Sequence, residues 1–380
     1  MSTYPVGHHE PTGIGWKVFA VFAGFLLPFI IVVGAWLAIS AHNASNDARK
    51  AAASARSVQT AAPSAAMSST TGAVASPSFA GMAPANADEI AMNHAAFPAT
   101  LPAAPAGSVA HVQLSIGDHV VSIAPGIHYQ AWTFGTTAPG PVIHVRVGQR
   151  VDVTLTNKGS MPHSIDFHAA QIAPNVAFSD IAPGESKKFS WVASVPGAYM
   201  YHCGTAPAFE HIANGMYGAI IVEPKNMPPA QKEYVLVSSE WYLSSPGTAQ
   251  AAGLDVTKAE QMTPDWVTFN GYAAQYKTHP LTANPGDTVR FWVVDAGPSL
   301  NTEFHVVGTI LKRAWINADM VDAPQHDIQT AVVPAGGGGV FDVTIPNAGI
   351  YPFVSHSFAS VMLGEVGLLK VGNVDGTMSH

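Results

Sequence analysis

The chain is poor in cysteine and in charge. Its 380 residues include one cysteine, and 17 lysines and arginines stand against 25 aspartates and glutamates, for a formal net charge of −8. A single cysteine excludes an intramolecular disulfide, and the acidic balance argues against a nucleic-acid partner, which basic patches would attract. The sequence also lacks the glycine-rich phosphate loop, the dinucleotide fingerprint and the CxxCH haem motif, so none of these cofactors is expected.

One long apolar run is present near the start. Residues 18–39 read VFAVFAGFLLPFIIVVGAWLAI, about 22 residues without a charge, which is long enough to cross a bilayer as a helix. A cleaved signal peptide is the alternative, but its apolar core is normally shorter, roughly 7–15 residues. Lys17 precedes the run and three basic residues follow it, which mildly favours a cytoplasmic linker, although large domains translocate regardless of such charges. We expect an N-terminal tail at 1–17, an uncleaved transmembrane helix at 18–39, and export of the domains beyond it.

The composition changes twice after the apolar run. Residues 40–108 are rich in Ala, Ser, Pro and Thr and contain few large apolar side chains, so we expect a flexible tether there. From residue 109 onward, β-branched residues alternate or run together and are punctuated by Gly, Pro and Asn, which is typical of strands. A break at EPKNMPP divides this part, so we expect domains at 109–225 and 226–373 and a tail at 374–380.

The two β-rich halves contain similar phrases. PGESKKFSWVASVPGAYMYHC and PAGGGGVFDVTIPNAGIYPFVSH each read as a turn, a strand, a Pro/Gly corner and a strand that ends in histidine. Repetition of this kind indicates two β-sandwiches of related design.

The single cysteine lies in a loop with other potential metal ligands. A buried free cysteine is usually only a small apolar side chain. Here His211 and Met216 follow Cys203 in the pattern C-x7-H-x4-M. One thiolate, two imidazoles and a weak thioether form the ligand set of a blue, or type 1, copper site. The second imidazole must then come from an adjacent strand.

The phrase MPHSIDFH supplies two more histidines. His163 and His168 are five residues apart, and in a regular strand an odd separation places side chains on opposite faces. The same parity separates His202 from Cys203. If His163 joins Cys203 on one face, His168 can join His202 on the other, and Asp166 shares that outer face. Two short motifs thereby predict two metal sites back to back.

The outer pair needs a third ligand, since a catalytic metal site typically keeps a few protein ligands and one open position. His305 in FHVVG and His356 in VSHSF, both in the second half, are the candidates. The second half has no cysteine, so it cannot hold a type 1 site of its own. A lone histidine in a strand is ordinarily a core or surface side chain and not a metal ligand. Spacing alone does not decide whether His305 or His356 is a ligand.

Together, MPHSIDFH, YHC…EHIANGMYG, FHVVG and SHS resemble the copper-containing nitrite reductases with two cupredoxin domains, over residues 109–371. The resemblance implies an all-β fold of two tandem cupredoxin-like Greek-key sandwiches. It also implies one type 1 and one type 2 copper per chain. The ligands would be His163, Cys203, His211 and Met216 for type 1 copper, and His168, His202 and, from the neighbouring subunit of a homotrimer, His356 for type 2 copper.

The resemblance further implies the activity. Asp166 and His305 match the pair that handles protons, Thr330 matches a threonine that supports the catalytic histidine, and Val307 occupies a pocket position where the family usually has isoleucine. The reaction would be the dissimilatory reduction of nitrite by one electron to nitric oxide and water. The electron would come from a cytochrome c or a cupredoxin and pass through Cys203 and His202. The helix at 18–39 would anchor periplasmic catalytic domains to a bacterial inner membrane.

Two other functions compete with this one. A multicopper oxidase needs a trinuclear cluster with several H-x-H motifs, and the chain contains no H-x-H. A membrane-tethered blue-copper electron carrier would use the type 1 ligands but leave the outer histidines and Asp166 without a role. The number of bound copper ions distinguishes the enzyme from the carrier.

Overall fold

The computed structural model describes residues 76–375. Within them, no helix is long and apolar enough to cross a membrane. The helix expected at 18–39, the tail at 1–17 and the last residues, 376–380, lie outside the described part.

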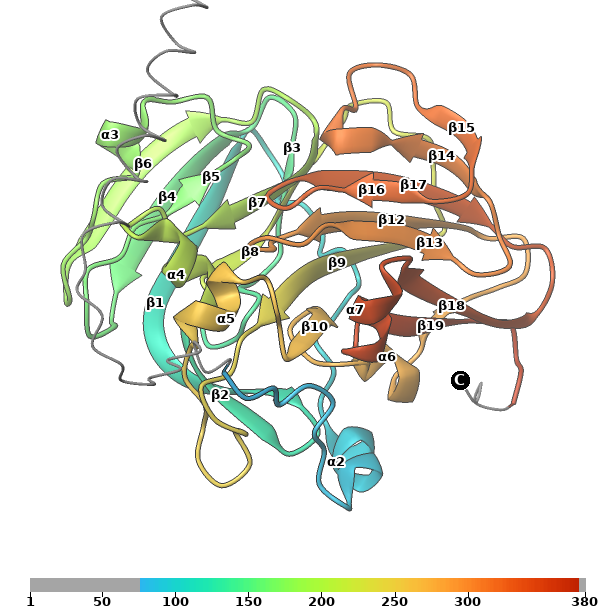
Figure 1. The fold of residues 1–380 in the computed structure, drawn as a ribbon. Helices are drawn as coiled ribbons and strands as arrows, with labels where there is room; N and C mark the ends of the chain where they lie inside the picture. Colours follow the sequence, from blue (N-terminus) through green and yellow to red (C-terminus); the bar gives the residue numbers. More distant parts are fainter. Residues whose placement is uncertain (1–75, 376–380) are drawn as a thin grey trace, which may run out of the picture. The chain divides into compact units, whose positions relative to one another are not determined.

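Two tandem β-sandwiches make up the body of the protein (Figure 1), as the alternation of apolar residues predicts. The first sandwich has one sheet in the order β2-β1-β4-β6 and another in the order β3-β8-β7-β5. Its strands are β1 (Val109–Ala124), β2 (Ile127–Phe134), β3 (Ile143–Arg146), β4 (Arg150–Asn157), β5 (Asp166–Phe167), β6 (Ser186–Val192), β7 (Gly197–His202) and β8 (Tyr217–Glu223).

The second sandwich has a sheet in the order β10-β9-β12-β17-β14-β15 and another in the order β11-β19-β18-β13-β16. Its strands are β9 (Lys232–Trp241), β10 (Trp266–Phe269), β11 (Leu281–Ala283), β12 (Thr288–Asp295), β13 (Thr302–Val306), β14 (Leu311–Trp315), β15 (Gln325–Ile328), β16 (Ala331–Val333), β17 (Gly338–Thr344), β18 (Gly349–Ser355) and β19 (Val366–Val371). The helices are short: α2 (Ala87–Asn93), α3 (Pro174–Ala177), α4 (Ala208–Ala213), α5 (Val256–Glu260), α6 (Gln275–Thr278), α7 (Phe358–Met362) and the 3-10 turn η1 (Ile316–Ala318).

The repeated phrases form equivalent strand pairs. The first phrase forms β6 and β7, and the second forms β17 and β18, each pair separated by a Pro/Gly corner. The next strand along the chain also pairs alike in the two domains, since β7 is antiparallel to β8 and β18 is antiparallel to β19. The two domains are therefore related in structure as well as in sequence pattern.

Strand β7 separates two apolar cores. Tyr201 and Cys203 belong to the core inside the first sandwich, whereas Ala198 and Met200 belong to a core that joins the two domains. Side chains in a strand alternate between faces, so His202 follows Ala198 and Met200 away from the first core. This alternation places Cys203 and its neighbour His202 on opposite sides of one strand.

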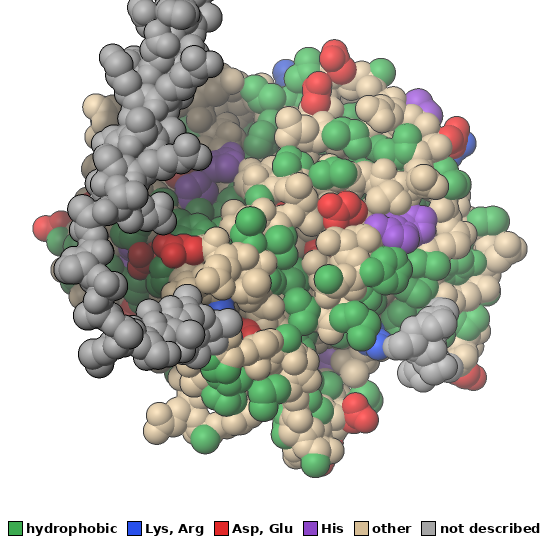
Figure 2. Space-filling view, viewed as in Figure 1, with side chains coloured by type: hydrophobic (Ala, Val, Ile, Leu, Met, Phe, Trp, Pro, Cys, Tyr) green, Lys and Arg blue, Asp and Glu red, His purple; other side chains and the backbone are tan. Residues whose placement is uncertain are grey.

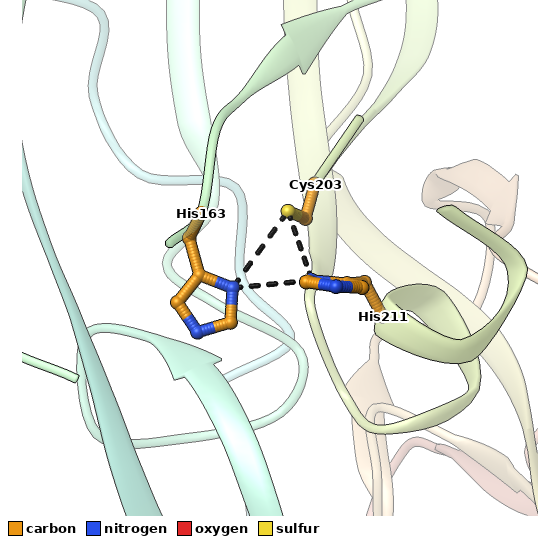
Figure 3. A group of neighbouring side chains, drawn as sticks. All are labelled: His163, Cys203 and His211. Atoms are coloured by element: carbon orange, nitrogen blue, oxygen red, sulfur yellow. Dashed lines mark hydrogen bonds between the residues drawn. The ribbon is translucent and has the colours of Figure 1, made fainter. Parts of the chain in front are cut away.

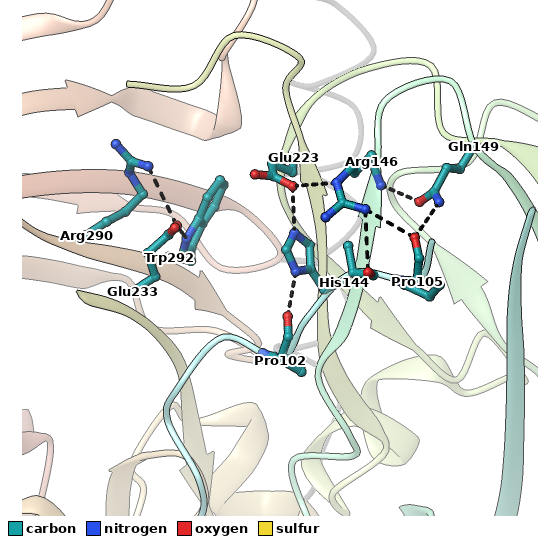
Figure 4. A network of polar contacts seen from close by, with 10 residues as sticks. Pro102, Pro105, His144, Arg146, Gln149, Glu223, Glu233, Arg290 and Trp292 are labelled. Carbon is teal, nitrogen blue, oxygen red and sulfur yellow. Dashed lines mark hydrogen bonds and ion pairs between the residues drawn. The ribbon is translucent and has the colours of Figure 1, made fainter. Parts of the chain in front are cut away.

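The flexible tether expected through residue 108 is wrong from residue 76 onward. In residues 76–108, helix α2 forms, Ala99 is buried and Thr100 pairs with Tyr234. The main-chain carbonyls of this segment are bound by side chains of the first domain. His144 Nδ1 lies 2.6 Å from Pro102 O, and Gln149 Nε2 donates to Pro105 O at 2.9 Å (Figure 4). The composition argument considered only apolar side chains and so missed main-chain bonding, which does not depend on them.

A buried ion pair stabilises the second domain. Arg290 and Asp342 are both buried on adjacent strands, and Arg290 Nε and Nη2 donate to the two carboxylate oxygens at 2.7 and 2.9 Å. Arg313 also donates to Asp342. Glu233 lies 3.6 Å from Arg290, and Figure 4 shows this second contact of the arginine. On the face in Figure 2, Lys and Arg side chains are few and scattered.

Candidate metal centres

Three of the predicted ligands converge in the first sandwich. His163, Cys203 and His211 are all buried, and Figure 3 shows their side chains pointing toward one another. The two Nδ1 atoms are 3.1 Å apart, and Cys203 Sγ lies 3.2 Å from His211 Nδ1 and 3.9 Å from His163 Nδ1. Met216, the fourth predicted ligand, is also buried, and its carbonyl accepts the Cys203 N–H at 3.1 Å.

These separations fit a shared metal ion. In a tetrahedral site with metal–nitrogen bonds of about 2.05 Å and metal–sulfur bonds of about 2.3 Å, the nitrogens are about 3.3 Å apart and sulfur is about 3.6 Å from each nitrogen. Burial, with a smaller contribution from His211, lowers the pKa of His163 to about 4, and burial lowers the pKa of His211 as well. Both imidazoles are therefore neutral at pH 7, which is the form that binds a metal.

Local structure explains how the three ligands meet. His163 exchanges two main-chain bonds with Ile181, and the buried Asn157 amide donates to the carbonyl of Ile181 at 2.8 Å, which fixes this loop. Cys203 follows directly after β7, and His211 lies in α4, one turn before β8. The rings of His163 and His211 also pack against Trp132, with centroids 5.5 and 4.8 Å away.

The sequence argument missed Ser164. Its N–H donates to Cys203 Sγ at 3.4 Å, and its hydroxyl accepts the Gly204 N–H at 3.0 Å. Thr205 donates to Asp180 at 2.8 Å and contacts the same Ser164 hydroxyl. Hydrogen-bond donors stabilise the negative charge of a thiolate. The Ser164 N–H therefore stabilises the thiolate form of Cys203. The only signal in the sequence is its position directly after His163.

The outer cluster also forms. The ligand atoms of Asp166, His168 and His202 lie within 4.8 Å of one another. His168 Nδ1 donates to Gly336 O and His202 Nδ1 donates to Cys203 O, each at 2.9 Å, because a carbonyl can only accept. Each neutral ring then carries a lone pair on Nε2, and the two Nε2 atoms are 3.0 Å apart.

Two facing lone pairs repel unless a cation lies between them. A proton there is disfavoured because burial lowers the pKa of His202. Metal-binding histidines almost always donate their other ring N–H to a carbonyl or carboxylate, and both rings here do so. The outer cluster therefore fits a metal ion bound by two Nε2 atoms, with Asp166 beside it.

His305 and His356 do not join that cluster within the chain. They lie beside each other in the second domain, with ring centroids 5.1 Å apart, and His356 is exposed. His305 Nδ1 bonds the carbonyl of Gln329 at 2.5 Å. Thr330 directly follows Gln329, and Val307 lies just past the end of β13 and is 39% exposed. Gly336 and Gln329 are further residues that the sequence argument missed, since they act through main-chain oxygens.

Two tandem β-sandwiches, one of which contains a buried cluster of a single thiol and two imidazoles, define a copper protein with two cupredoxin-like domains. Models of the multicopper oxidase family match residues 115–227 and 232–361. The copper-containing nitrite reductase of Neisseria meningitidis serogroup B is 37% identical over 269 residues, which are 68% of this chain and 68% of that protein.

Solved structures agree. A copper nitrite reductase from Nitrosomonas europaea matches with a TM-score of 0.65 and 34% identity, over 70% of this chain and 94% of that one. The copper-containing nitrite reductase of Thermus scotoductus also matches with a TM-score of 0.65, at 26% identity, over 71% of this chain and 64% of that one. The chain belongs to the copper-containing nitrite reductases, as the resemblance of its motifs implied.

Proposed function

We propose that the protein reduces nitrite to nitric oxide: nitrite takes up one electron and two protons and yields nitric oxide and water. The observation that carries this proposal is the outer cluster, joined to the buried thiol cluster by the single peptide bond between His202 and Cys203. An electron carrier would need only the thiol cluster. The bond from His202 Nδ1 to Cys203 O at 2.9 Å adds a second connection between the two clusters.

The proposal assigns each cluster a copper ion. His163, Cys203, His211 and Met216 would hold type 1 copper, and His168 and His202 would be two of the type 2 ligands. When bound, copper supplies an electron-carrying centre at the thiolate and an open Lewis-acid position for nitrite at the imidazoles.

Asp166 and His305 would deliver the two protons. Asp166 lies in the outer cluster, where its carboxyl group can donate to a nitrite oxygen. The bond from His305 Nδ1 to Gln329 O fixes that ring and leaves Nε2 as the atom that exchanges a proton. An imidazole titrates near neutral pH, so it suits the second proton transfer. Thr330 would help to hold this loop, and Val307 would shape the pocket where nitrite binds.

A homotrimer would complete the site. His305 and His356 lie together in the second domain, apart from the cluster of Asp166, His168 and His202. Helix α7, which follows His356, exposes apolar side chains: Phe358, whose ring contacts His356, is 56% exposed, and Met362 at the other end of the helix is 80% exposed. Exposed apolar side chains that gather in one place often mark an interface. We therefore assign His305 and His356 to the site of a neighbouring subunit.

The remaining assignments concern location and donor. Residues 18–39 would anchor the protein in a bacterial inner membrane with the catalytic domains in the periplasm, where a cytochrome c or a cupredoxin would supply electrons. In fractionated cells the full chain should stay with membranes after a high-salt wash. Protease added to spheroplasts should then remove the catalytic domains. Release by salt, or protection from protease, would contradict these assignments.

The direct test of the reaction is Asp166→Asn. This variant should keep both copper ions, because the imidazoles and the thiol remain, but lose most nitric oxide production under a chemical electron donor. Asp152→Asn is the matched control, since Asp152 belongs to neither cluster and its carboxylate lies beside the side chains of Arg150 and His111. Full activity in Asp166→Asn with full copper loading would remove the proton-donating role.

A further inference from the structure

The second domain contains a counterpart of the buried thiol cluster. Val354 pairs with Val366 as His202 pairs with Tyr217, so Ser355 occupies the position of Cys203. The Glu303 N–H donates to Ser355 Oγ at 3.0 Å, as the Ser164 N–H donates to Cys203 Sγ.

The same equivalence extends to the other ligand positions. The Glu365 N–H donates to Ser360 O at 3.0 Å, as the Met216 N–H donates to His211 O at 3.1 Å. His305 pairs with Val354 as Asp166 pairs with His202, so Thr302 takes the position of His163. The four positions of the proposed copper ligands are thus occupied in the second domain by Thr302, Ser355, Ser360 and Glu365, which are all buried. These positions carry sulfur or nitrogen atoms in the first domain and oxygen atoms in the second.

Two more carboxyl groups lie near Glu365. Asp295 and Glu240, like Glu365, are buried. Asp295 is paired with Ser238 across β12 and β9, and the Ser238 hydroxyl donates to Glu365. Gly297 N–H donates to Asp295 and Ser299 N–H donates to Glu240, which places Glu240 close by. Glu365 Oε1 accepts hydroxyl bonds from Ser238 and Thr302, each at 2.7 Å. Asp295 Oδ1 accepts the Gly297 N–H at 2.8 Å, while its Oδ2 is buried without a hydrogen-bond partner.

Buried carboxyl groups that lie near one another need compensation for their charge. The bonds that the structure gives them come from hydroxyl groups and main-chain N–H groups, which carry no full charge. Burial raises the pKa of Asp295 well above its usual range, and the neighbouring carboxylates of Glu365 and Glu240 raise it further. Buried carboxylates are stabilised by a cation or else become protonated.

We propose that this cluster is a calcium site of the second domain, formed by the carboxylates of Asp295 and Glu365 with the hydroxyl groups of Thr302 and Ser355. Ca²⁺ binds oxygen ligands in flexible geometry, whereas Mg²⁺ usually keeps several waters, so a buried site lined by protein oxygens suits Ca²⁺. Because Asp295 ends β12 and Glu365 precedes β19, the ion would join the two sheets of the second sandwich. Its role is structural and does not depend on the proposed reaction.

Calorimetric titration of the copper-loaded full chain with CaCl₂, after treatment with EGTA, tests the site. One Ca²⁺ should bind per chain and raise the melting temperature. Asp295→Asn and Glu365→Gln, which keep the side-chain shape, should weaken binding by about tenfold or more, the size expected when the ligand environment of a metal is disturbed. Asp322→Asn, which changes an exposed carboxylate in the same domain, should leave the affinity unchanged.

The alternative is that protons alone neutralise the cluster. In that case wild-type protein shows no heat of binding and no change in melting temperature up to millimolar CaCl₂. The two amide variants would then raise the melting temperature equally with and without Ca²⁺. Either result overturns the proposal, and so does Ca²⁺ binding that both variants retain at full strength, because the ion would then lie elsewhere.

Discussion

Subunit complementation tests the proposed division of the site between chains. We consider two variants, His168→Ala and His356→Ala, each of which removes one exposed imidazole from a different half of the site. Neither substitution touches the buried thiol cluster. Each variant alone should form oligomers that retain the thiol-bound copper and lack nitrite reduction.

The expected recovery follows from the proposed division of the site between neighbouring chains. A site is intact when the His356→Ala chain supplies Asp166, His168 and His202 and its neighbour, a His168→Ala chain, supplies His356. In a ring assembled at random from equal amounts, each chain is of the required kind in half of the cases, so about one quarter of the sites are intact. Electron entry is also preserved there, because His202 and Cys203 are intact in every chain.

The assay is nitric oxide release from co-expressed variants under a chemical electron donor, per chain and relative to wild type. Separately purified variants, mixed without subunit exchange, provide the control and should remain inactive. Co-expressed protein that is no more active than either variant alone would refute the shared site. Activity of His356→Ala alone would remove His356 from the set of ligands.

Three further predictions concern single substitutions. Cys203→Ser should abolish the blue colour and lower the copper content by one ion per chain, because the chain has no other thiol; a blue variant in absorption spectroscopy would contradict the assignment. Asp342→Asn leaves the buried Arg290 with a weakened partner and should cost about 3–5 kcal/mol in urea unfolding, whereas a loss below about 1 kcal/mol would show that the pair is dispensable. Burial raises the pKa of Glu365 to about 7 from its ordinary 4.5, so the folded state binds this proton more tightly and stability falls as pH rises between these values. In calcium-free protein, Glu365→Gln should therefore raise the melting temperature more at pH 8 than at pH 5, and an equal gain at both would contradict this.

Sequence parity separated His163 and Cys203 from His168, His202 and Asp166, and the structure groups these residues in the same way. The prediction assumed a regular strand through MPHSIDFH, but β5 covers only Asp166 and Phe167, and His163 lies in an isolated bridge. The predicted separation of His202 from Cys203 is still correct, because β7 is regular up to His202 and the alternation of side chains continues to Cys203. One regular strand was enough to assign two sites.

The errors and omissions share a physical cause. Residues 76–108 bind the first domain largely through main-chain carbonyls such as that of Pro102, and the outer imidazoles are oriented by the carbonyls of Gly336 and Cys203. Main-chain groups are the same in every residue, so composition and motif spacing carry no record of them. The equivalence of Ser355 and Cys203 likewise required the strand register, because the loops between the matched positions differ in length.

Copper content together with nitric oxide release tests the central claim most directly. Purified full-length protein should contain two copper ions per chain, one of them blue, and should release nitric oxide from nitrite when a chemical donor supplies electrons. One copper ion per chain, a blue band and no nitric oxide would contradict the account, because His168 and His202 would then hold no working metal and the protein would be a tethered electron carrier.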